Sequence, residues 1–230
     1  MPEEHKSTDF KPRVVRAILF CDNMFTPDVV DHRRAVIKSI LEALESSDSP
    51  ETFGAQVQKK VFHFRKEVVE VDALSWIAVL GSKFDNLEEV IAYSRELASL
   101  IFQHLSPRNA LPVITTGVTS AILVWLASKH VPTGLWAHEV GTVFSGVNKR
   151  LIDVMNYAVL QAAEHKDFAD TSDVRGLLPF EHCVFVATWA HVAMSNADEI
   201  KSFALSRSAS EASLILAISS ARFGWPKDED

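Results

Sequence analysis

A near match to a zinc-protease motif is the most recognisable catalytic pattern in the chain. His138 and Glu139 supply the first two residues of His-Glu-x-x-His, in which two histidines one helical turn apart bind zinc and the glutamate activates water. Thr142 occupies the position of the second histidine. Because that ligand is missing, we interpret the pair as a solvent-exposed His-Glu at the start of a helix.

Two pairs of glutamates lie three residues apart on predicted helices, Glu42 with Glu45 and Glu67 with Glu70. Carboxylates at this spacing share one helix face, and they resemble the magnesium-binding pairs of some all-α nucleotide pyrophosphohydrolases. That family adds further acidic residues from neighbouring helices. The pairs leave open a magnesium-dependent nucleotide hydrolase, and the competing interpretation is a solvated helix surface.

Three aspartates recur at every third residue of a polar stretch, at Asp167, Asp170 and Asp173. Three carboxylates on one loop are donors that a hard cation prefers. Turn chemistry explains them more simply, because aspartate side chains accept hydrogen bonds from nearby backbone N–H groups. We therefore predict a turn-rich connector over residues 167–176.

A cysteine and two histidines near the C-terminal end could suggest nucleophilic or metal chemistry. Cys183 follows His182 directly, but adjacent helical side chains point about 100° apart. His182 and His191 are nine residues apart and lie on different faces of a helix, so we predict that His191 is a core histidine with a backbone or hydroxyl partner. The chain also lacks the phosphate-loop, dinucleotide, nucleophile-elbow and di-iron motifs. We predict no catalytic residue, no bound metal and no cofactor.

Basic residues gather around aromatic residues in the first third of the chain. The candidate nucleic-acid-binding residues are Lys59, Lys60, Arg65, Lys66, Arg33 and Arg34, and Phe62 and Phe64 lie among them. If their helices pack side by side, these residues form a basic groove that could follow a single RNA strand. The alternative is a solvated face on which the same cations pair with neighbouring glutamates.

Apolar spacing and helix-start signals predict helices along most of the chain. Thr26-Pro27-Asp28 combines an N-cap, a first-turn proline and an acidic residue, and residues 85–88 and 208–211 have capping-box patterns. Helices are expected at 27–46, from 50 onward, at 73–80, 87–105, 109–128, 147–162 and 180–194, in a short segment after 195, and at 208–221. The segment from 133 is either two helices or one kinked helix, because Gly141 and Gly146 interrupt it.

Residues 109–128 contain no charged side chain, which is unusual for a segment of this length. The stretch approaches the length of a membrane span, but several threonines, a serine and a glycine dilute it. Its β-branched residues also leave a pair of strands open. We predict a buried central helix wrapped by amphipathic helices, without stable membrane insertion.

Composition favours a single all-α domain. The 230 residues are 47% hydrophobic and 23% charged, with only 8 glycines and 9 prolines to interrupt helices. We predict a compact orthogonal bundle of about eight or nine helices over residues 13–222, which the connector at 167–176 could subdivide. Residues 1–12 and 223–230 are predicted to be mobile N- and C-terminal arms.

Cysteine use and the first residues indicate the cellular compartment, and the net charge bears on nucleic-acid binding. Two cysteines far apart match neither a disulfide framework nor a metal spacing, and the first residues lack the apolar core of a secretory signal. We therefore expect an intracellular, cytoplasmic protein. A formal net charge of −7 argues against a generic phosphate-backbone binder, although a local basic groove is compatible with it.

Three hypotheses for function follow. The first is a non-catalytic protein-interaction or self-assembly protein, which uses an apolar groove between helices or its tails to bind another protein or itself. Phe223 and Trp225 suggest that the C-terminal arm could anchor on a neighbour. The second is a nucleocapsid-like protein that binds single-stranded RNA in the basic groove. The third is the magnesium-dependent hydrolase of the glutamate pairs.

Overall fold

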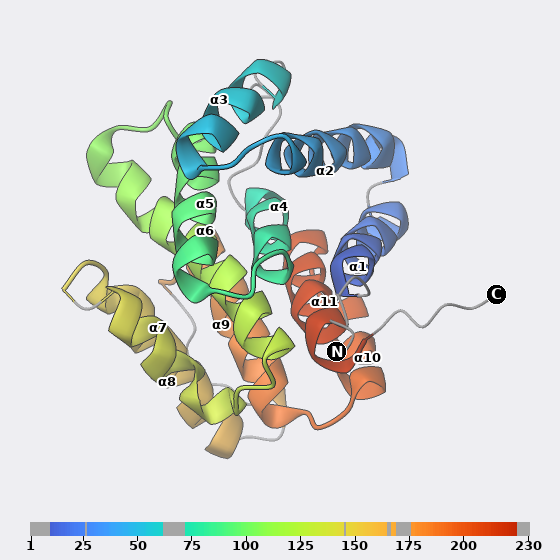
Figure 1. The fold of residues 1–230 in the computed structure, drawn as a ribbon. Helices are drawn as coiled ribbons and strands as arrows, with labels where there is room; N and C mark the ends of the chain where they lie inside the picture. Colours follow the sequence, from blue (N-terminus) through green and yellow to red (C-terminus); the bar gives the residue numbers. More distant parts are fainter. Residues whose placement is uncertain are drawn as a thin grey trace, which may run out of the picture.

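The computed structural model describes residues 10–25, 27–61, 72–144, 146–164, 167–168 and 176–224. These residues form α-helices joined by turns and 3-10 helices, and no strand occurs among them, which confirms the all-α prediction (Figure 1). In chain order the elements are α1 (Phe10–Phe25), η1 (Pro27–Val29), α2 (Val30–Glu45), α3 (Pro50–Val61), α4 (Asp72–Ala78), η3 (Val79–Ser82), α5 (Leu87–Ile101), α6 (Pro107–Ser128), η4 (Thr133–Leu135), α7 (Trp136–Phe144), α8 (Lys149–Glu164), α9 (Pro179–Ala193), α10 (Ala197–Leu205) and α11 (Ala209–Phe223).

Helix α6 is the central element, as the uncharged segment predicted. It packs against α4, α5, α7, α9 and α11, and residues 115–124 are buried without interruption. By length and composition α6 could also cross a membrane, but 78% of its most apolar stretch lies inside the protein. The segment is therefore a buried core helix and not a pair of strands.

The hydroxyl groups of α6 are satisfied within the core. Thr116 Oγ1 donates to the carbonyl oxygen of Pro112 (2.8 Å), and Thr119 Oγ1 donates to that of Thr115 (2.9 Å). Ser120 Oγ lies within hydrogen-bonding distance of two carbonyl oxygens, that of Gly117 (2.6 Å) and that of Leu74 in α4 (2.8 Å). Because these groups have partners, α6 can be buried despite its polar residues.

Small residues let α4 and η3 approach α6 closely. A Cβ atom on Gly81 would lie 2.0 Å from the carbonyl oxygen of Ala121, and one on Gly117 would lie 2.8 Å from Ile77 Cδ1. Only glycine leaves room for the backbone of η3 against that of α6. The helix predicted at 73–80 ends as an α-helix at Ala78, and Gly81, where its end was expected, lies within η3.

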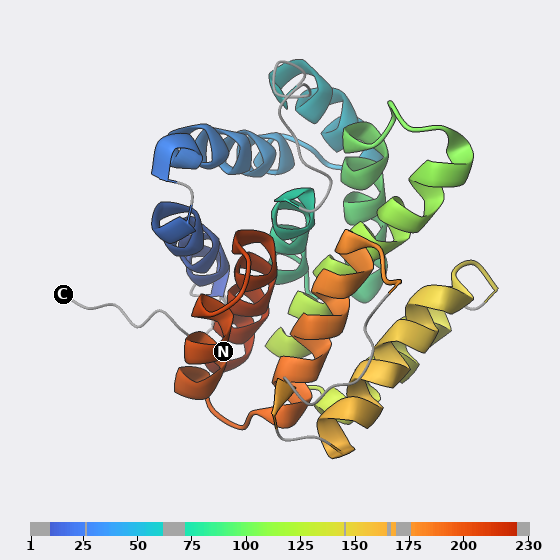
Figure 2. The same cartoon turned by 180° about the vertical axis from the view of Figure 1, so that it is seen from behind.

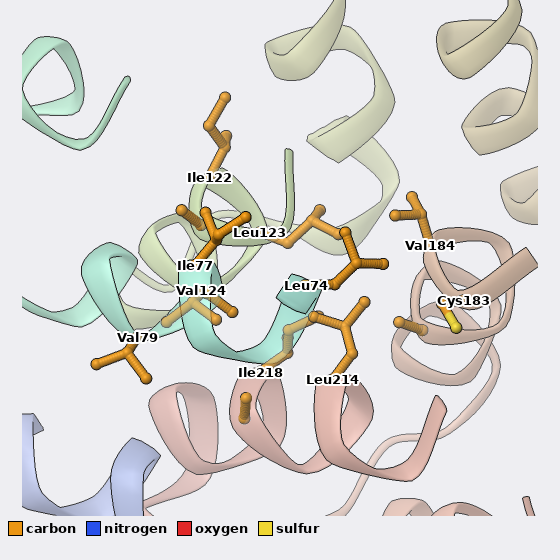
Figure 3. Packing of buried hydrophobic residues seen from close by; sticks show 14 of the residues in the cluster. Leu74, Ile77, Val79, Ile122, Leu123, Val124, Cys183, Val184, Leu214 and Ile218 are labelled. Atoms are coloured by element: carbon orange, nitrogen blue, oxygen red, sulfur yellow. The ribbon is translucent and has the colours of Figure 1, made fainter. Parts of the chain in front are cut away.

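Four helices contribute to the apolar core at the middle of the molecule (Figure 3). The labelled side chains include Leu74 and Ile77 from α4, Ile122, Leu123 and Val124 from α6, Cys183 and Val184 from α9, and Leu214 and Ile218 from α11. Each fully buried aliphatic side chain contributes about 1.5–3 kcal/mol relative to exposure. This shared core ties the first half of the chain to the second.

The remaining helices cover the core on two sides. Helix α1 packs on α11, α2 on α3, and α3 on α5, whereas α7 and α8 form a pair on the opposite side of α6 (Figure 1). Seen from behind, α9 lies between α8 and α11 (Figure 2). Helix α10 leads from the end of α9 back to the start of α11, and it packs on both.

Capping residues begin several helices. The N-cap of α5 is Asn86, one residue after the start of the capping box predicted over residues 85–88. Asn86 caps α5 by accepting a hydrogen bond from the backbone N–H of Glu88 (2.8 Å), and Asn196 caps α10 through the N–H of Glu199 (2.9 Å). Ser208 and Glu211 form the predicted capping box of α11. These local hydrogen bonds explain why the starts of these helices could be read from the sequence.

Three predictions of helix number and boundaries were wrong. The described residues contain eleven α-helices, and not eight or nine. Helix α1 begins at Phe10, inside the segment expected as an arm, and α11 extends through Phe223. Helix α1 has no acidic residue in its first turn and no basic residue in its last, so its ends carry little local signal, and packing against α11 stabilises it. Residues 1–9 and 225–230 of the predicted arms lie outside the described residues.

Candidate functional site

The two cysteines are buried, and their thiols are unreactive as nucleophiles. Burial, with a smaller contribution from the neighbouring Asp22 carboxylate, raises the pKa of the Cys21 thiol to about 12. Burial and the Glu211 carboxylate also raise the pKa of Cys183 well above its usual range. Both side chains are therefore protonated thiols at neutral pH, which disfavours a thiolate nucleophile at either position.

His191 is the core histidine that the sequence predicted. Its Nδ1 donates to the carbonyl oxygen of Ala187 (2.8 Å), and its ring lies 5.6 Å from that of Trp136. Burial lowers the pKa of His191 to about 4, so the ring is neutral at physiological pH. His182 lies elsewhere on α9 and pairs with Glu211 of α11.

The predicted basic residues divide into different environments. Arg33 donates to Asp22 Oδ1 (2.6 Å) and Asp72 Oδ2 (2.8 Å), and its side chain is only 11% exposed. Asp72 also accepts a hydrogen bond from Ser210 Oγ (2.7 Å). Arg33 is thus the centre of a buried ion cluster that joins α1, α2, α4 and α11.

The other members of the basic set lie at the surface or outside the described residues. Arg34 pairs with the exposed Asp31 (3.2 Å), and Lys59 is exposed in the last turn of α3. Arg65 and Lys66 lie outside the described residues, so the RNA groove is not tested and stays a prediction.

The acidic pairs and triplets are only partly described. Glu42 pairs with Lys60 of α3 (3.0 Å), and its hydrogen bond with this lysine lowers the pKa of Glu42. This contact matches the interpretation in which lysines and glutamates neutralise each other on a solvated face. Glu67, Glu70, Asp170 and Asp173 lie outside the described residues. Among the side chains that are described, no group of three or more histidines, cysteines and acidic residues is arranged to hold a metal ion.

An aromatic pocket lies between α9 and α10 and is lined by described residues. It has a volume of about 520 Å³, within the range of sites that accept ligands or anchoring side chains. Its lining residues are Asp167, Phe168, Trp189, Met194, Phe203, Ser206 and Arg207. We call this site the aromatic pocket.

The walls of the aromatic pocket are rings in mutual contact. The Phe168 ring meets Trp189 edge-on with a centroid distance of 4.9 Å, and Phe203 lies 5.4 Å from each of the two. Aromatic pairs at such distances contribute about 0.5–1.5 kcal/mol each beyond the area that they bury. The walls are therefore formed before any ligand binds.

A second hollow continues the aromatic pocket toward the start of α10. It has a volume of about 630 Å³ and shares Met194 and Phe203 with the first. Asp198 and Glu199 also line it, and both are exposed. The two hollows together form an α9–α10 groove with an aromatic end and an acidic end.

Arg207 supplies the positive charge at the aromatic end. Its guanidinium carbon lies 4.6 Å from the centroid of Phe168 and 5.7 Å from that of Phe203, which are cation–π distances. Its Nε lies 3.3 Å from Glu211 Oε2, and His182 Nδ1 lies 2.7 Å from the other oxygen of that carboxylate. Burial raises the pKa of Glu211, but the hydrogen bonds from His182 and Ser208 outweigh it and lower the pKa to about 2. Glu211 is therefore ionised, and its carboxylate forms an ion pair with Arg207.

The arrangement suits binding better than bond chemistry, because aromatic rings and a fixed cation recognise ligands but supply no nucleophile. Sequence reasoning missed this site. The signal that could have found it is the four-residue spacing of Phe185 and Trp189, which puts two aromatic side chains on one face of α9. Comparison of the chain with protein-family models, with curated proteins and with solved structures found no match.

Proposed function

We propose that this protein is a non-catalytic helical interaction protein, which binds a protein partner by taking a large apolar side chain into the aromatic pocket. The observation that carries the proposal is the pocket itself, with preformed aromatic walls and a fixed arginine at its rim. Tryptophan, tyrosine and arginine dominate the binding energy of protein interfaces, so a pocket of this composition suits a partner's anchoring residue.

The state of the possible nucleophiles supports a binding role. Both cysteine thiols are buried, and burial keeps their pKa values high. His191 is neutral and its Nδ1 is committed to a backbone carbonyl within α9. The groove between α9 and α10 is open at the surface and holds side chains with recognised roles in binding.

A selection from a random peptide library tests the proposal without knowledge of the partner. The full chain is immobilised and the library is displayed on phage. We expect enriched peptides to share a large aromatic or aliphatic residue and to lose at least tenfold in affinity when that residue is replaced by alanine. No enrichment over an empty surface would overturn the proposal.

Three variants show whether selected peptides occupy the aromatic pocket. Phe203→Ala removes one wall, and Ser206→Trp places a large ring at the exposed rim without removing a core contact. Both should weaken binding at least tenfold. Leu160→Ala, at an exposed position on α8 away from the groove, is the matched control and should bind within twofold of the unaltered protein. Equal binding by Ser206→Trp and Leu160→Ala would contradict the assignment, provided that their melting curves match.

A further inference from the structure

Two hydrogen-bond donors of the aromatic pocket have no acceptor. Trp189 is 1% exposed, and its indole N–H has no hydrogen-bond partner in the described structure. Arg207 Nε is likewise buried without a hydrogen-bond partner among the described residues, although it lies 3.3 Å from Glu211 Oε2 in an ion pair. A buried donor without an acceptor costs about 1–3 kcal/mol, and a ligand oxygen that reached either donor would recover that cost. The pocket thus suits a ligand that combines an aromatic group with carbonyl or carboxylate oxygens.

The chain contains such a ligand immediately after α11. Residues 225–230 read Trp-Pro-Lys-Asp-Glu-Asp, an aromatic residue followed by a cation and three carboxylates. The ring suits the aromatic walls, the carboxylates suit Arg207, and Lys227 suits the acidic end of the groove at Asp198 and Glu199. We propose that the occupant of the α9–α10 groove is this C-terminal segment of a second copy of the chain, an inference that rests on the proposed function.

The position of the end of α11 favours a second copy over the same molecule. Arg207 precedes the first residue of α11, whereas Gly224 caps its last turn in a left-handed conformation with φ +72°. The 15 residues of α11 separate these two points by about 22 Å. Trp225 follows Gly224 directly, and one residue advances the chain by at most about 3.6 Å. Its ring therefore cannot stack beside Arg207 of its own molecule.

A pocket on one copy that receives a segment from another is a head-to-tail contact. Because each copy has both the pocket and the C-terminal sequence, the contact can repeat from copy to copy. The expected products are rings or open chains whose size grows with protein concentration. This gives the self-assembly hypothesis a specific contact.

Binding of the isolated segment is the first measurement. A fluorescein-labelled peptide of residues 222–230 is titrated with the full-length Trp225→Ala protein, which has an intact pocket, and fluorescence anisotropy is recorded. We expect saturable binding that weakens at least tenfold with the Trp225→Ala peptide and at least fivefold when its three acidic residues become amides. No binding of the peptide, while library peptides still bind at the pocket, would overturn this inference and leave the proposed function standing. If neither the C-terminal peptide nor any library peptide binds, both this inference and the proposed function are overturned.

Complementation between two variants tests occupation by a second copy. Ser206→Trp blocks the pocket and keeps the segment, whereas Trp225→Ala keeps the pocket and removes the anchor. Light scattering after size exclusion should show that the unaltered protein associates, that each variant alone is monomeric, and that their mixture forms a one-to-one complex. A mixture that stays monomeric while the labelled peptide still binds would show occupation within one molecule and would overturn the proposal of a second copy.

Discussion

Replacement of Gly81 by alanine should destabilise the protein more than replacement of Gly117, the other glycine at the contact between α6 and its neighbours. The new Cβ would lie 2.0 Å from the carbonyl oxygen of Ala121 and 2.9 Å from its carbonyl carbon. These are backbone atoms of the central helix, so they cannot rotate away as the end of a side chain does. The clash must be relieved by moving η3 away from α6.

The loss of stability in Gly81→Ala follows from how far the backbones of η3 and α6 must separate. An ordinary contact at this position is about 3.4 Å or more, so the segments must part by more than 1 Å. That shift loosens the packing of Ile77 and Leu80, which are fully buried beside α6. Overpacking of a dense core costs about 1–3 kcal/mol, and a rigid backbone neighbour places Gly81→Ala at about 3 kcal/mol. For a chain of this size the melting temperature should fall by about 6–12 °C.

Two other glycines make a graded comparison. A Cβ on Gly117 would lie 2.8 Å from Ile77 Cδ1, which is the far end of a flexible side chain, so Gly117→Ala should cost about 1 kcal/mol. A Cβ on Gly134 has no neighbour within 4 Å, and Gly134→Ala should leave stability within about 0.5 kcal/mol of the original.

Thermal unfolding followed by circular dichroism and calorimetry measures the series. The expected order of melting temperatures is Gly134→Ala highest, Gly117→Ala intermediate and Gly81→Ala lowest. If Gly81→Ala melts within about 2 °C of the unaltered protein, or above Gly117→Ala, then η3 does not approach α6 as described, and the reasoning from this contact is refuted.

Three further predictions concern charge. Arg33→Met removes the cation from the buried Asp22 and from Asp72, which is 15% exposed, and should cost about 3 kcal/mol in chemical denaturation. Arg34→Met removes an exposed ion pair and should cost less than about 1 kcal/mol, and similar costs for the two variants would argue against the ion cluster around Arg33. Burial lowers the pKa of His191 to about 4, so only the unfolded chain takes up a proton there as the pH falls from about 6.5, and up to about 3 kcal/mol of stability should be lost by pH 4. His191→Phe should lose this part of the pH dependence, and an unchanged profile would contradict a neutral buried histidine. If Lys59 and Lys60 line an RNA groove, the full-length protein should shift single-stranded RNA in about 50 mM salt, and their double replacement by alanine should weaken the shift; no shift by the unaltered protein would reject the groove.

Local signals account for the helices that the sequence predicted well. Asn86, Asn196 and Ser208 satisfy backbone groups within the turn that follows them, and such hydrogen bonds need no distant partner. The uncharged composition of 109–128 likewise points to burial, because nearly every face of that helix must meet other apolar surface. His191 follows the same logic, since its Nδ1 bonds to a carbonyl one turn earlier in its own helix.

Other boundaries depended on contacts across the fold. The sequence left open whether the segment from residue 133 forms two helices or one kinked helix. In the structure the segment forms two helices, α7 and α8. Gly141 lies within α7, and Gly146, with a left-handed φ of +81°, lies between the two helices. Helix α1 was missed because α11, far along the chain, supplies the surface on which it packs. Propensity is a weak guide where such distant packing decides.

The amino-acid sequence by itself determined the helical class, the central helix and several of the helix starts, because these depend on side-chain periodicity and on hydrogen bonds within a few residues. The tertiary structure alone decided that Arg33 serves a buried ion cluster, and that Phe168, Trp189, Phe203 and Arg207 share one pocket. These groups come from segments far apart in the chain, so only helix packing brings them within contact distance. The candidate binding site is thus a product of how the helices meet, whereas the helices themselves are largely a product of local sequence.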